Sequence, residues 1–295
     1  MHRRQLLQGT AALTAATSIG WPAPASQAAL RMRFAPHFGQ FAALAGEDPV
    51  AQLEWAKDQG FTAFEDNGMM GRPEEEQRRI GQALERLGLT MGVFVANFGT
   101  AFGKRSFASG AAEHLQSFLA DLGQTVEVAK RVGARWTTIV LGDRDPGLEL
   151  DYQHAHAIEM LKRGAEIFEP HGLVMVMEPL NPWRDHAGML LTKAAQAHML
   201  CTAVDSPAVR ILFDIYHQQI SEGHLIANIG RFQIGDNPGR NEPGTGEIHY
   251  ANVLRHIRAR GFDGVLGMEH GQSLPGAEGQ RAVLAAYRAL DAALA

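Results

Sequence analysis

Cysteine is nearly absent from this sequence, because Cys201 is the single one among 295 residues. No intramolecular disulfide can form, and a zinc site built from several thiolates is excluded. Aromatic residues make up only 7%, and 27 basic residues are outnumbered by 32 acidic ones, which leaves a net charge of -5. An acidic chain is a poor match for a polyanion, so we expect no nucleic-acid partner.

Two further patterns are missing. After residue 29, no run is long and apolar enough to cross a bilayer, and no low-complexity linker divides the chain. No glycine-rich dinucleotide fingerprint follows the first expected strand, residues 32–36, which argues against a Rossmann fold. Because 45% of the residues are hydrophobic, the chain can bury a large core, and we expect a single domain over residues 29–295.

The N-terminal segment has the pattern of an export signal. Arg3 and Arg4 precede a short apolar stretch, residues 9–20, and small residues follow up to Ala28. This pattern predicts a twin-arginine signal peptide over residues 1–28, a periplasmic location, and no membrane attachment after cleavage. A disordered basic tail is the alternative interpretation.

Short apolar runs then alternate with longer amphipathic ones. They predict eight strands, at residues 32–36, 62–65, 90–96, 136–141, 173–178, 209–214, 231–235 and 264–269. They also predict eight helices, at residues 49–59, 73–87, 111–132, 152–170, 190–203, 222–229, 250–260 and 278–294. Five of the helices end in a glycine, which favours the left-handed conformation that terminates a helix: Gly60, Gly88, Gly133, Gly172 and Gly261.

Eight strand–helix units favour an α/β fold of the closed (β/α)8 TIM barrel type. An open, doubly wound sheet stays an alternative, since periodicity does not show closure. Only fifteen residues, 216–230, connect the sixth and seventh strands, so we expect a shortened sixth helix.

Four of the expected strands end in a polar side chain that could serve a common site. These residues are Glu178, Asp214, Gln233 and Glu269. In a parallel barrel the carboxyl ends of the strands meet on one face, where the active sites of such barrels lie. Carboxylate and amide oxygens suit a hard divalent cation, and Mg²⁺ or Mn²⁺ is favoured over Zn²⁺.

Four motifs in this part of the chain resemble the hydroxypyruvate isomerase family, which belongs to the xylose isomerase-like barrels. The motifs are Met177-Glu-Pro-Leu-Asn181, Phe213-Asp-Ile-Tyr-His217, Gln233-Ile-Gly-Asp-Asn-Pro-Gly-Arg240 and Glu242-Pro-Gly-Thr-Gly-Glu247. The resemblance is strong over residues 174–269. Before them only the strand–helix rhythm agrees, and the loops at 36–39, 65–70 and 97–99 differ, so we expect a different substrate pocket.

The resemblance implies a divalent metal held by Glu178, Asp214, Gln233 and Glu269. It implies that Glu178 and Glu269 are also the catalytic pair that moves a proton, and that His217 and Arg240 bind the substrate. His37, at the end of the first strand, is a further candidate for the barrel mouth. The alternatives for these residues are ordinary: a solvated glutamate, a packed histidine, or an arginine paired with Asp236 or Glu242.

The chemistry of this residue set is proton transfer between adjacent carbons, since a cation stabilises an oxyanion while a carboxylate removes a proton. The leading hypothesis is a metal-dependent ketose–aldose isomerase that acts on a small hydroxy-oxo acid through an enediolate, and the resemblance implies hydroxypyruvate and tartronate semialdehyde as the substrate pair. A sugar 3-epimerase or another sugar isomerase of this fold, a non-catalytic exported binding protein for sugar acids, and a barrel phosphodiesterase are the alternatives. The isomerase, the epimerase and the binding protein would each act on a small molecule. The sequence does not determine whether the chain forms a homo-oligomer.

Overall fold

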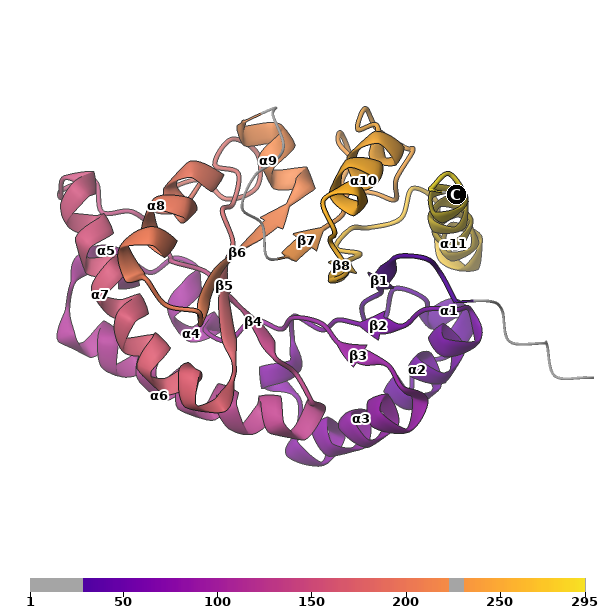
Figure 1. The fold of residues 1–295 in the computed structure, drawn as a ribbon, viewed down its shortest axis with the longest axis horizontal. Coiled ribbons are helices and arrows are strands. Elements are labelled where there is room, and N and C mark those ends of the chain that lie inside the picture. The colour runs from indigo at the N-terminus through magenta and orange to yellow at the C-terminus, as the bar shows by residue number, and fades with distance from the viewer. Residues whose placement is uncertain (1–28, 223–230, 295) are drawn as a thin grey trace, which may run out of the picture.

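Eight parallel strands form the inside of the molecule in the computed structural model, which describes residues 29–222 and 231–294 (Figure 1). The strands are β1 (Arg33–Ala35), β2 (Ala63–Phe64), β3 (Thr90–Met91), β4 (Trp136–Ile139), β5 (Val174–Met177), β6 (Val209–Asp214), β7 (Arg231–Gln233) and β8 (Val265–Gly267). Six pair in the order β1-β8-β7-β6-β5-β4, and β2 pairs with β3.

Two isolated bridges join these sheets into a ring. His37 pairs with Glu65 beyond the ends of β1 and β2, and Val95 pairs with Thr138 between the β3 segment and β4. The strands therefore close as a barrel, which confirms the predicted TIM barrel and excludes the open sheet. β3 is shorter than expected, and residues 92–96 of the predicted strand contribute a bridge rather than a continuous ladder.

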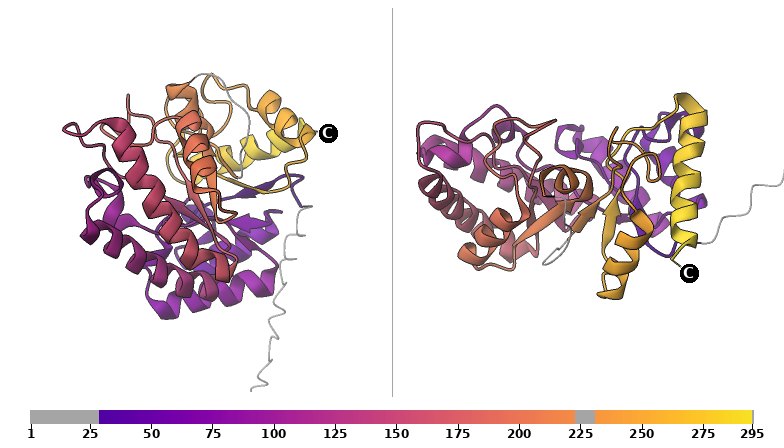
Figure 2. Two further views of the ribbon diagram at one scale, coloured as in Figure 1. Left: turned by 60° about the vertical axis from the view of Figure 1, so that its left-hand side comes forward. Right: turned by 90° about the horizontal axis from the view of Figure 1, so that it is seen from above.

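Helices cover the outside of the strands, and both further views show the same arrangement (Figure 2). The long ones are α2 (Pro49–Asp58), α3 (Glu74–Leu87), α6 (Ala112–Val132), α7 (Leu150–Phe168), α8 (Ala194–Val204), α10 (Tyr250–Ala259) and α11 (Gly276–Ala292). Shorter ones are α1 (Ala42–Ala45), α4 (Phe98–Ala101), α5 (Ser106–Ser109) and α9 (Ile215–Ser221), with 3-10 turns at Met69–Gly71 and Glu169–His171. No helix in the described ranges is long and apolar enough to cross a membrane.

Local sequence signals explain where the helices begin and end. Asp48 caps α2 by accepting the Ala51 N–H at 3.2 Å, and Pro49 occupies the first helical position. The five glycines expected to end helices all have positive φ, as for Gly88 at 63° and Gly133 at 66°. Each helix can therefore stop and turn into the next strand at little steric cost.

The sixth crossover differs from the expectation. Its helix begins at Ile215, directly after β6, rather than near residue 222, because the Asp214 side chain accepts the Tyr216 N–H at 2.8 Å and caps it. The described part of α9 is seven residues long. The remainder of the predicted helix, from residue 223 to 229, lies outside the described residues.

The helices pack closely against one another and against the strands. A Cβ at Gly81 of α3 would lie 1.8 Å from the Arg131 carbonyl oxygen of α6, so only glycine permits this approach. All four residues of β5 are buried. Strands buried on both faces are continuous apolar runs in such barrels, and the polar side chains are left for the strand ends.

Candidate functional site

The four strand-end residues of the predicted site lie on four adjacent strands. Asp214 is the register partner of Gln233, and Gln233 is the partner of Gly267 in β8. Glu178 directly follows β5, and Glu269 comes two residues after β8. The parallel strands therefore bring all four to the same end of the barrel.

Two carboxylates and one imidazole form a tight cluster at this end. One side-chain atom each of Glu178, Asp214 and His217 lies within 4.8 Å of the others, and all three residues are buried. His217 Nε2 is 3.5 Å from Asp214 Oδ2 and 3.8 Å from Glu178 Oε1. Buried carboxylates this close repel each other unless a positive charge lies between them.

Several buried atoms of the predicted metal ligands have no hydrogen-bond partner among the residues that the structure describes. They include Asp214 Oδ2, Gln233 Oε1 and Glu269 Oε2. Leaving a polar oxygen buried and unpaired is costly, so such atoms are normally satisfied. Oxygens of two carboxylates and one amide are suitable ligands for a hard divalent cation, and the residues present therefore fit one.

Burial changes the acidity of both carboxyl groups in the cluster. It raises the pKa of Asp214 to about 7, although the Arg240 guanidinium acts in the opposite direction. Burial, together with the charges of Glu269 and Asp214, raises the pKa of Glu178 well above its usual range. Burial therefore disfavours the ionised forms of Glu178 and Asp214 when no cation is bound.

Arg240 supplies positive charge from the loop after β7. Its Nη2 atom is 3.4 Å from Glu269 Oε1 and 3.6 Å from Asp214 Oδ2, and its guanidinium lies 5.0 Å from the centre of the Tyr216 ring. Burial lowers the pKa of Arg240, but the charges of Glu269 and Asp214 raise it above its usual value. Arg240 therefore forms ion pairs with two predicted metal ligands, Glu269 and Asp214, and not with Asp236 or Glu242.

Asp236 has a different role, since it holds the loop that carries Arg240. Its carboxylate accepts the backbone N–H groups of Asn237, Gly244, Gly246 and Ile248 at 2.7–3.1 Å. Four such bonds fix the course of the Gly- and Pro-rich loop. Arg240 itself has a φ of 52°, a conformation that this loop must maintain.

Hydrogen bonds determine which nitrogen of His217 carries a proton. Its Nδ1 atom accepts the Asn181 backbone N–H at 3.4 Å and lies 2.6 Å from the Asn181 side-chain amide nitrogen. Burial and the nearby Arg240 lower the pKa of His217 well below its usual value, so the ring is neutral. The remaining proton is therefore on Nε2, which faces the carboxylates and can be donated to a substrate oxygen.

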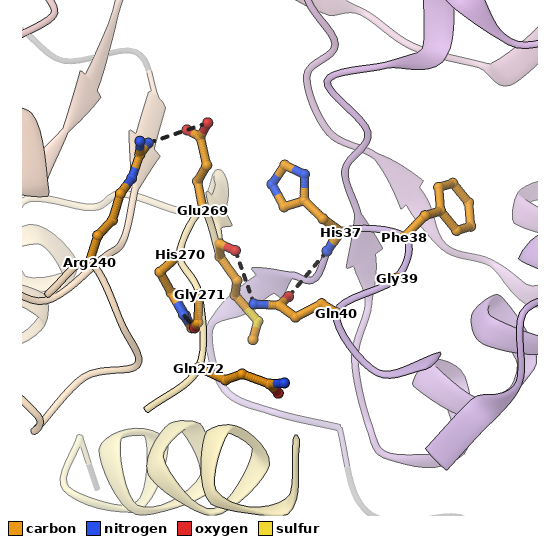
Figure 3. Close-up of a pocket in the computed structure, with 10 residues that line it drawn as sticks. His37, Phe38, Gly39, Gln40, Arg240, Glu269, His270, Gly271 and Gln272 are labelled. Carbon is orange, nitrogen blue, oxygen red and sulfur yellow. Dashed lines mark hydrogen bonds and ion pairs between the residues drawn. The ribbon is translucent and has the colours of Figure 1, made fainter. Parts of the chain in front are cut away.

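A cavity of about 500 Å³ adjoins the cluster (Figure 3). It is lined by His37, Phe38, Gly39, Gln40, Arg240, Met268, Glu269, His270, Gly271 and Gln272. Glu269 is both a lining residue and a predicted metal ligand, and Arg240, predicted to bind the substrate, lines the cavity and lies 3.6 Å from the predicted ligand Asp214, so the cavity is continuous with the predicted metal site. Figure 3 shows His37 and Gln40 across the cavity from Arg240. His37 thus lies at the barrel mouth, as expected.

Two residues after β2 complete the site and were not singled out from the sequence. Asn67 donates its side-chain N–H to Glu269 Oε1 at 2.9 Å. Glu65 is fully buried, with Oε2 3.4 Å from His37 Nε2, and a Cβ at Gly267 would lie only 2.2 Å from that oxygen. Burial lowers the pKa of His37, but the bond to Glu65 and its charge raise it. Their position after a strand was the signal that could have identified them.

The family described as "Xylose isomerase-like TIM barrel" matches residues 53–290. Hydroxypyruvate isomerase from Escherichia coli is 31% identical over 162 residues, which are 52% of this chain and 62% of that protein. The chain therefore matches less than two thirds of that relative's length. A 2-oxo-tetronate isomerase from Cupriavidus necator is 28% identical over 67% of this chain and 78% of that protein.

Solved structures share the fold. A 3-keto-D-glucoside 4-epimerase from E. coli superposes with a TM-score of 0.71 and 21% identity, over 88% of this chain and 100% of that one. A family 2 AP endonuclease from Brucella melitensis also has a TM-score of 0.71, with 23% identity over 84% of this chain and 96% of that one. At these identities the likeness establishes the barrel, and the chemistry must be inferred from the site.

Proposed function

The chain belongs to the xylose isomerase-like TIM barrel family, and we propose that it is a metal-dependent isomerase of a small hydroxy-oxo acid. The interconversion of hydroxypyruvate and tartronate semialdehyde is the leading reaction, and relatives named hydroxypyruvate isomerase and 2-oxo-tetronate isomerase support this substrate class. The observation that carries the proposal is the buried cluster of Glu178, Asp214 and His217 at the strand ends, together with buried oxygens of Asp214, Gln233 and Glu269 that have no hydrogen-bond partner among the described residues.

Glu178, Asp214, Gln233 and Glu269 would hold the divalent cation, with Mg²⁺ or Mn²⁺ favoured by four oxygen donors. When bound, the ion supplies positive charge that stabilises the oxyanion of the substrate. His217 Nε2 already carries a proton, so we assign it to hydrogen bonding with a substrate oxygen rather than to the ion.

Glu178 and Glu269 are the proposed proton-transfer pair. One removes a proton from a substrate carbon, and the other returns a proton to the adjacent carbon of the enediolate. Burial raises the pKa of Glu178 in the metal-free protein, and a bound cation would lower it, so the carboxylate would be ionised and able to accept a proton. Asn67 and Arg240 both contact Glu269 Oε1, which orients that carboxylate.

Arg240 and His37 would bind the acid group of the substrate. The planar guanidinium can hold two carboxylate oxygens at once, and its fixed loop places it at the border of the cavity. His37 faces the same cavity from β1, where buried Glu65 favours its protonated form. An anionic substrate would thus have positive charge on two sides.

Solvent deuterium exchange tests this function. The purified protein, loaded with Mg²⁺ or Mn²⁺, is incubated in deuterated water with C3 to C6 hydroxy-oxo acids and ketoses, and products are analysed by NMR. We expect metal-dependent incorporation at the carbon next to the carbonyl. A tightly bound substrate with no exchange would instead identify a non-catalytic binding protein.

A sugar 3-epimerase is the second candidate, favoured by the cavity of about 500 Å³, which exceeds what a C3 acid occupies. It would use the same glutamate pair on a longer substrate, and the exchange experiment distinguishes it by the position of the deuterium. A phosphodiesterase is disfavoured, because the acidic chain, with a net charge of -5, would repel a polyanionic substrate.

The export signal also stays a proposal, because residues 1–28 lie outside the described part of the chain. We propose that Arg3 and Arg4 direct the folded domain, residues 29–295, to the periplasm. The double substitution R3K/R4K should retain the protein in the cytoplasm of an expressing cell, as measured by fractionation. Export of this variant at the normal level would refute the twin-arginine assignment.

A further inference from the structure

An exposed carboxylate, that of Asp185, lies at the outer edge of the site in the loop after β5. Its Oδ2 atom accepts hydrogen bonds from the Asn181 side-chain amide and from the Tyr216 hydroxyl, both at 2.8 Å. Both of these partners are buried. Asp185 therefore connects the loop after β5 with helix α9, which carries Tyr216.

Asn181 fixes the position of this carboxylate. Its Oδ1 atom accepts the backbone N–H groups of Arg184 and Asp185, at 3.0 and 3.2 Å, which closes the turn that carries Asp185. With its oxygen used in this way, the amide presents its N–H groups to the carboxylate. Burial raises the pKa of Asp185, but the hydrogen bonds from Asn181 and Tyr216 lower it below its usual value. Asp185 is therefore an ionised group held in one position.

The Tyr216 ring links Asp185 to Arg240. The ring hydroxyl donates to Asp185, and the Arg240 guanidinium lies over the ring face, 5.0 Å from its centre. A cation over an aromatic face is attracted by the negative charge of the π system. A hydroxyl that donates to a carboxylate is polarised, which leaves more electron density in the ring and strengthens this attraction. Asp185, Tyr216 and Arg240 therefore form a connected series.

The contact with Tyr216 differs in kind from the ion pairs of Arg240. Those pairs are with Asp214 and Glu269, at 3.6 and 3.4 Å, and both partners are predicted metal ligands. A cation bound by these carboxylates would offset their negative charge and weaken their attraction for Arg240. Tyr216 is not a predicted ligand, so its ring would continue to hold the guanidinium at the border of the cavity.

We propose that Asp185 is a positioning residue for Arg240 that acts through Tyr216. It would thereby determine how tightly the site binds the carboxylate of its substrate. The inference rests on the proposed function, in which Arg240 binds the acid group of a hydroxy-oxo acid. Asp185 itself is assigned no contact with the substrate.

Kinetics of the Mn²⁺-loaded protein with hydroxypyruvate test this role. Asp185→Ala should raise KM by about 10-fold, the lower end of what one hydrogen bond to a charged group contributes, with a smaller change in kcat. Tyr216→Phe keeps the ring but loses the hydroxyl, so it should have the same effect and serves as a second variant if Asp185→Ala fails to fold. Asp185→Asn keeps an oxygen acceptor of the same size and should restore most of the affinity.

A double variant separates positioning from a general loss of stability. In an Arg240→Lys background, Asp185→Ala should raise KM no further, because the two residues act in series, whereas independent effects would multiply. Asp263→Ala is the matched control, since Asp263 is also exposed but precedes β8, at the opposite end of the barrel from the site. It should leave KM unchanged.

Crystal structures of the Mn²⁺-loaded variants give a measurement that does not depend on activity. The Arg240 guanidinium should leave the Tyr216 face in Asp185→Ala and stay on it in Asp185→Asn. An unmoved guanidinium in Asp185→Ala, an unchanged KM, or a full further rise of KM in the double variant would overturn the inference. If the guanidinium moves as expected but no substrate exchanges deuterium, the proposed function fails and the positioning role stands.

Discussion

The two halves of the barrel carry different kinds of side chain at the same mouth. Strands β5 to β8 contribute two buried carboxyl groups, Glu178 and Asp214, and the partly buried Arg240 that lies beside them. Strands β1 to β3 contribute Asn67, His37 and the buried carboxyl group of Glu65, which lies 3.4 Å from His37. We infer that the second half performs the proton transfer and that the first half selects and orients the substrate. Variants in the two halves should therefore affect different kinetic constants.

The largest effect is expected in the second half, from Glu178→Gln and Glu269→Gln. Each removes a proton-transferring group at constant size, so kcat should fall by about 10³-fold while the circular dichroism spectrum is retained. Glu247→Gln serves as control, because Glu247 is an exposed loop residue that bonds Asn237. Full activity in both site variants would refute the assignment of the pair.

Arg240→Lys should have the next largest effect. Lysine retains the charge but loses the planar fork, so KM for an acid substrate should rise by roughly 10- to 100-fold, with a smaller change in kcat. Arg86→Lys, at an exposed ion pair with Glu54 on the helical surface, is the control and should leave KM unchanged. An unaltered KM in Arg240→Lys would exclude carboxylate binding by this residue.

Asn67→Ala tests how far the first half supports the catalytic half. It removes the 2.9 Å hydrogen bond to Glu269, so Glu269 loses one of its two orienting contacts. We expect kcat to fall by about 10-fold, the cost of one hydrogen bond to a charged group. Asn67→Asp would place a second negative charge there and should be more harmful. A harmless Asn67→Asp would show that Glu269 is oriented by Arg240 alone.

The smallest expected effect is on the stability of metal-free protein. Because burial raises the pKa of Asp214 from 3.8 to about 7, its contribution is fully present below pH 3.8 and is lost as pH rises through about 7. Relative to Asp214→Asn, the wild type should therefore lose Tm between pH 5 and 7.5, by roughly 5 °C. Adding Mn²⁺ should cancel the difference, since the ion binds the deprotonated group. A Tm difference independent of pH would contradict the burial argument.

Much of the second half was predictable from the sequence, for a physical reason. The strand-end rule identified Glu178 and Asp214 because each directly follows an apolar run, and the register of parallel strands brings such positions together. The resemblance pointed to the same residues. Five helix ends were predicted equally well, because glycine at positive φ is a local signal.

The first half was less predictable. The strand predicted at residues 62–65 ends at Glu65, but the motifs of the resemblance begin only at Met177, so Glu65 and Asn67 were not assigned a role. Their contacts with His37 and Glu269 join segments far apart in the sequence. Helix α9 begins early because Asp214 caps it. The sequence pattern predicted Asp214 only as a strand-end metal ligand, so it gave no sign of this cap.

Anomalous X-ray scattering from crystals grown with Mn²⁺ tests the central claim most directly. A single strong peak is predicted among the side-chain oxygens of Glu178, Asp214, Gln233 and Glu269, at about 2.2 Å from its ligands. The peak should be absent in Asp214→Ala crystals prepared in the same way. No peak at this position in the wild type, at saturating Mn²⁺, would contradict the account.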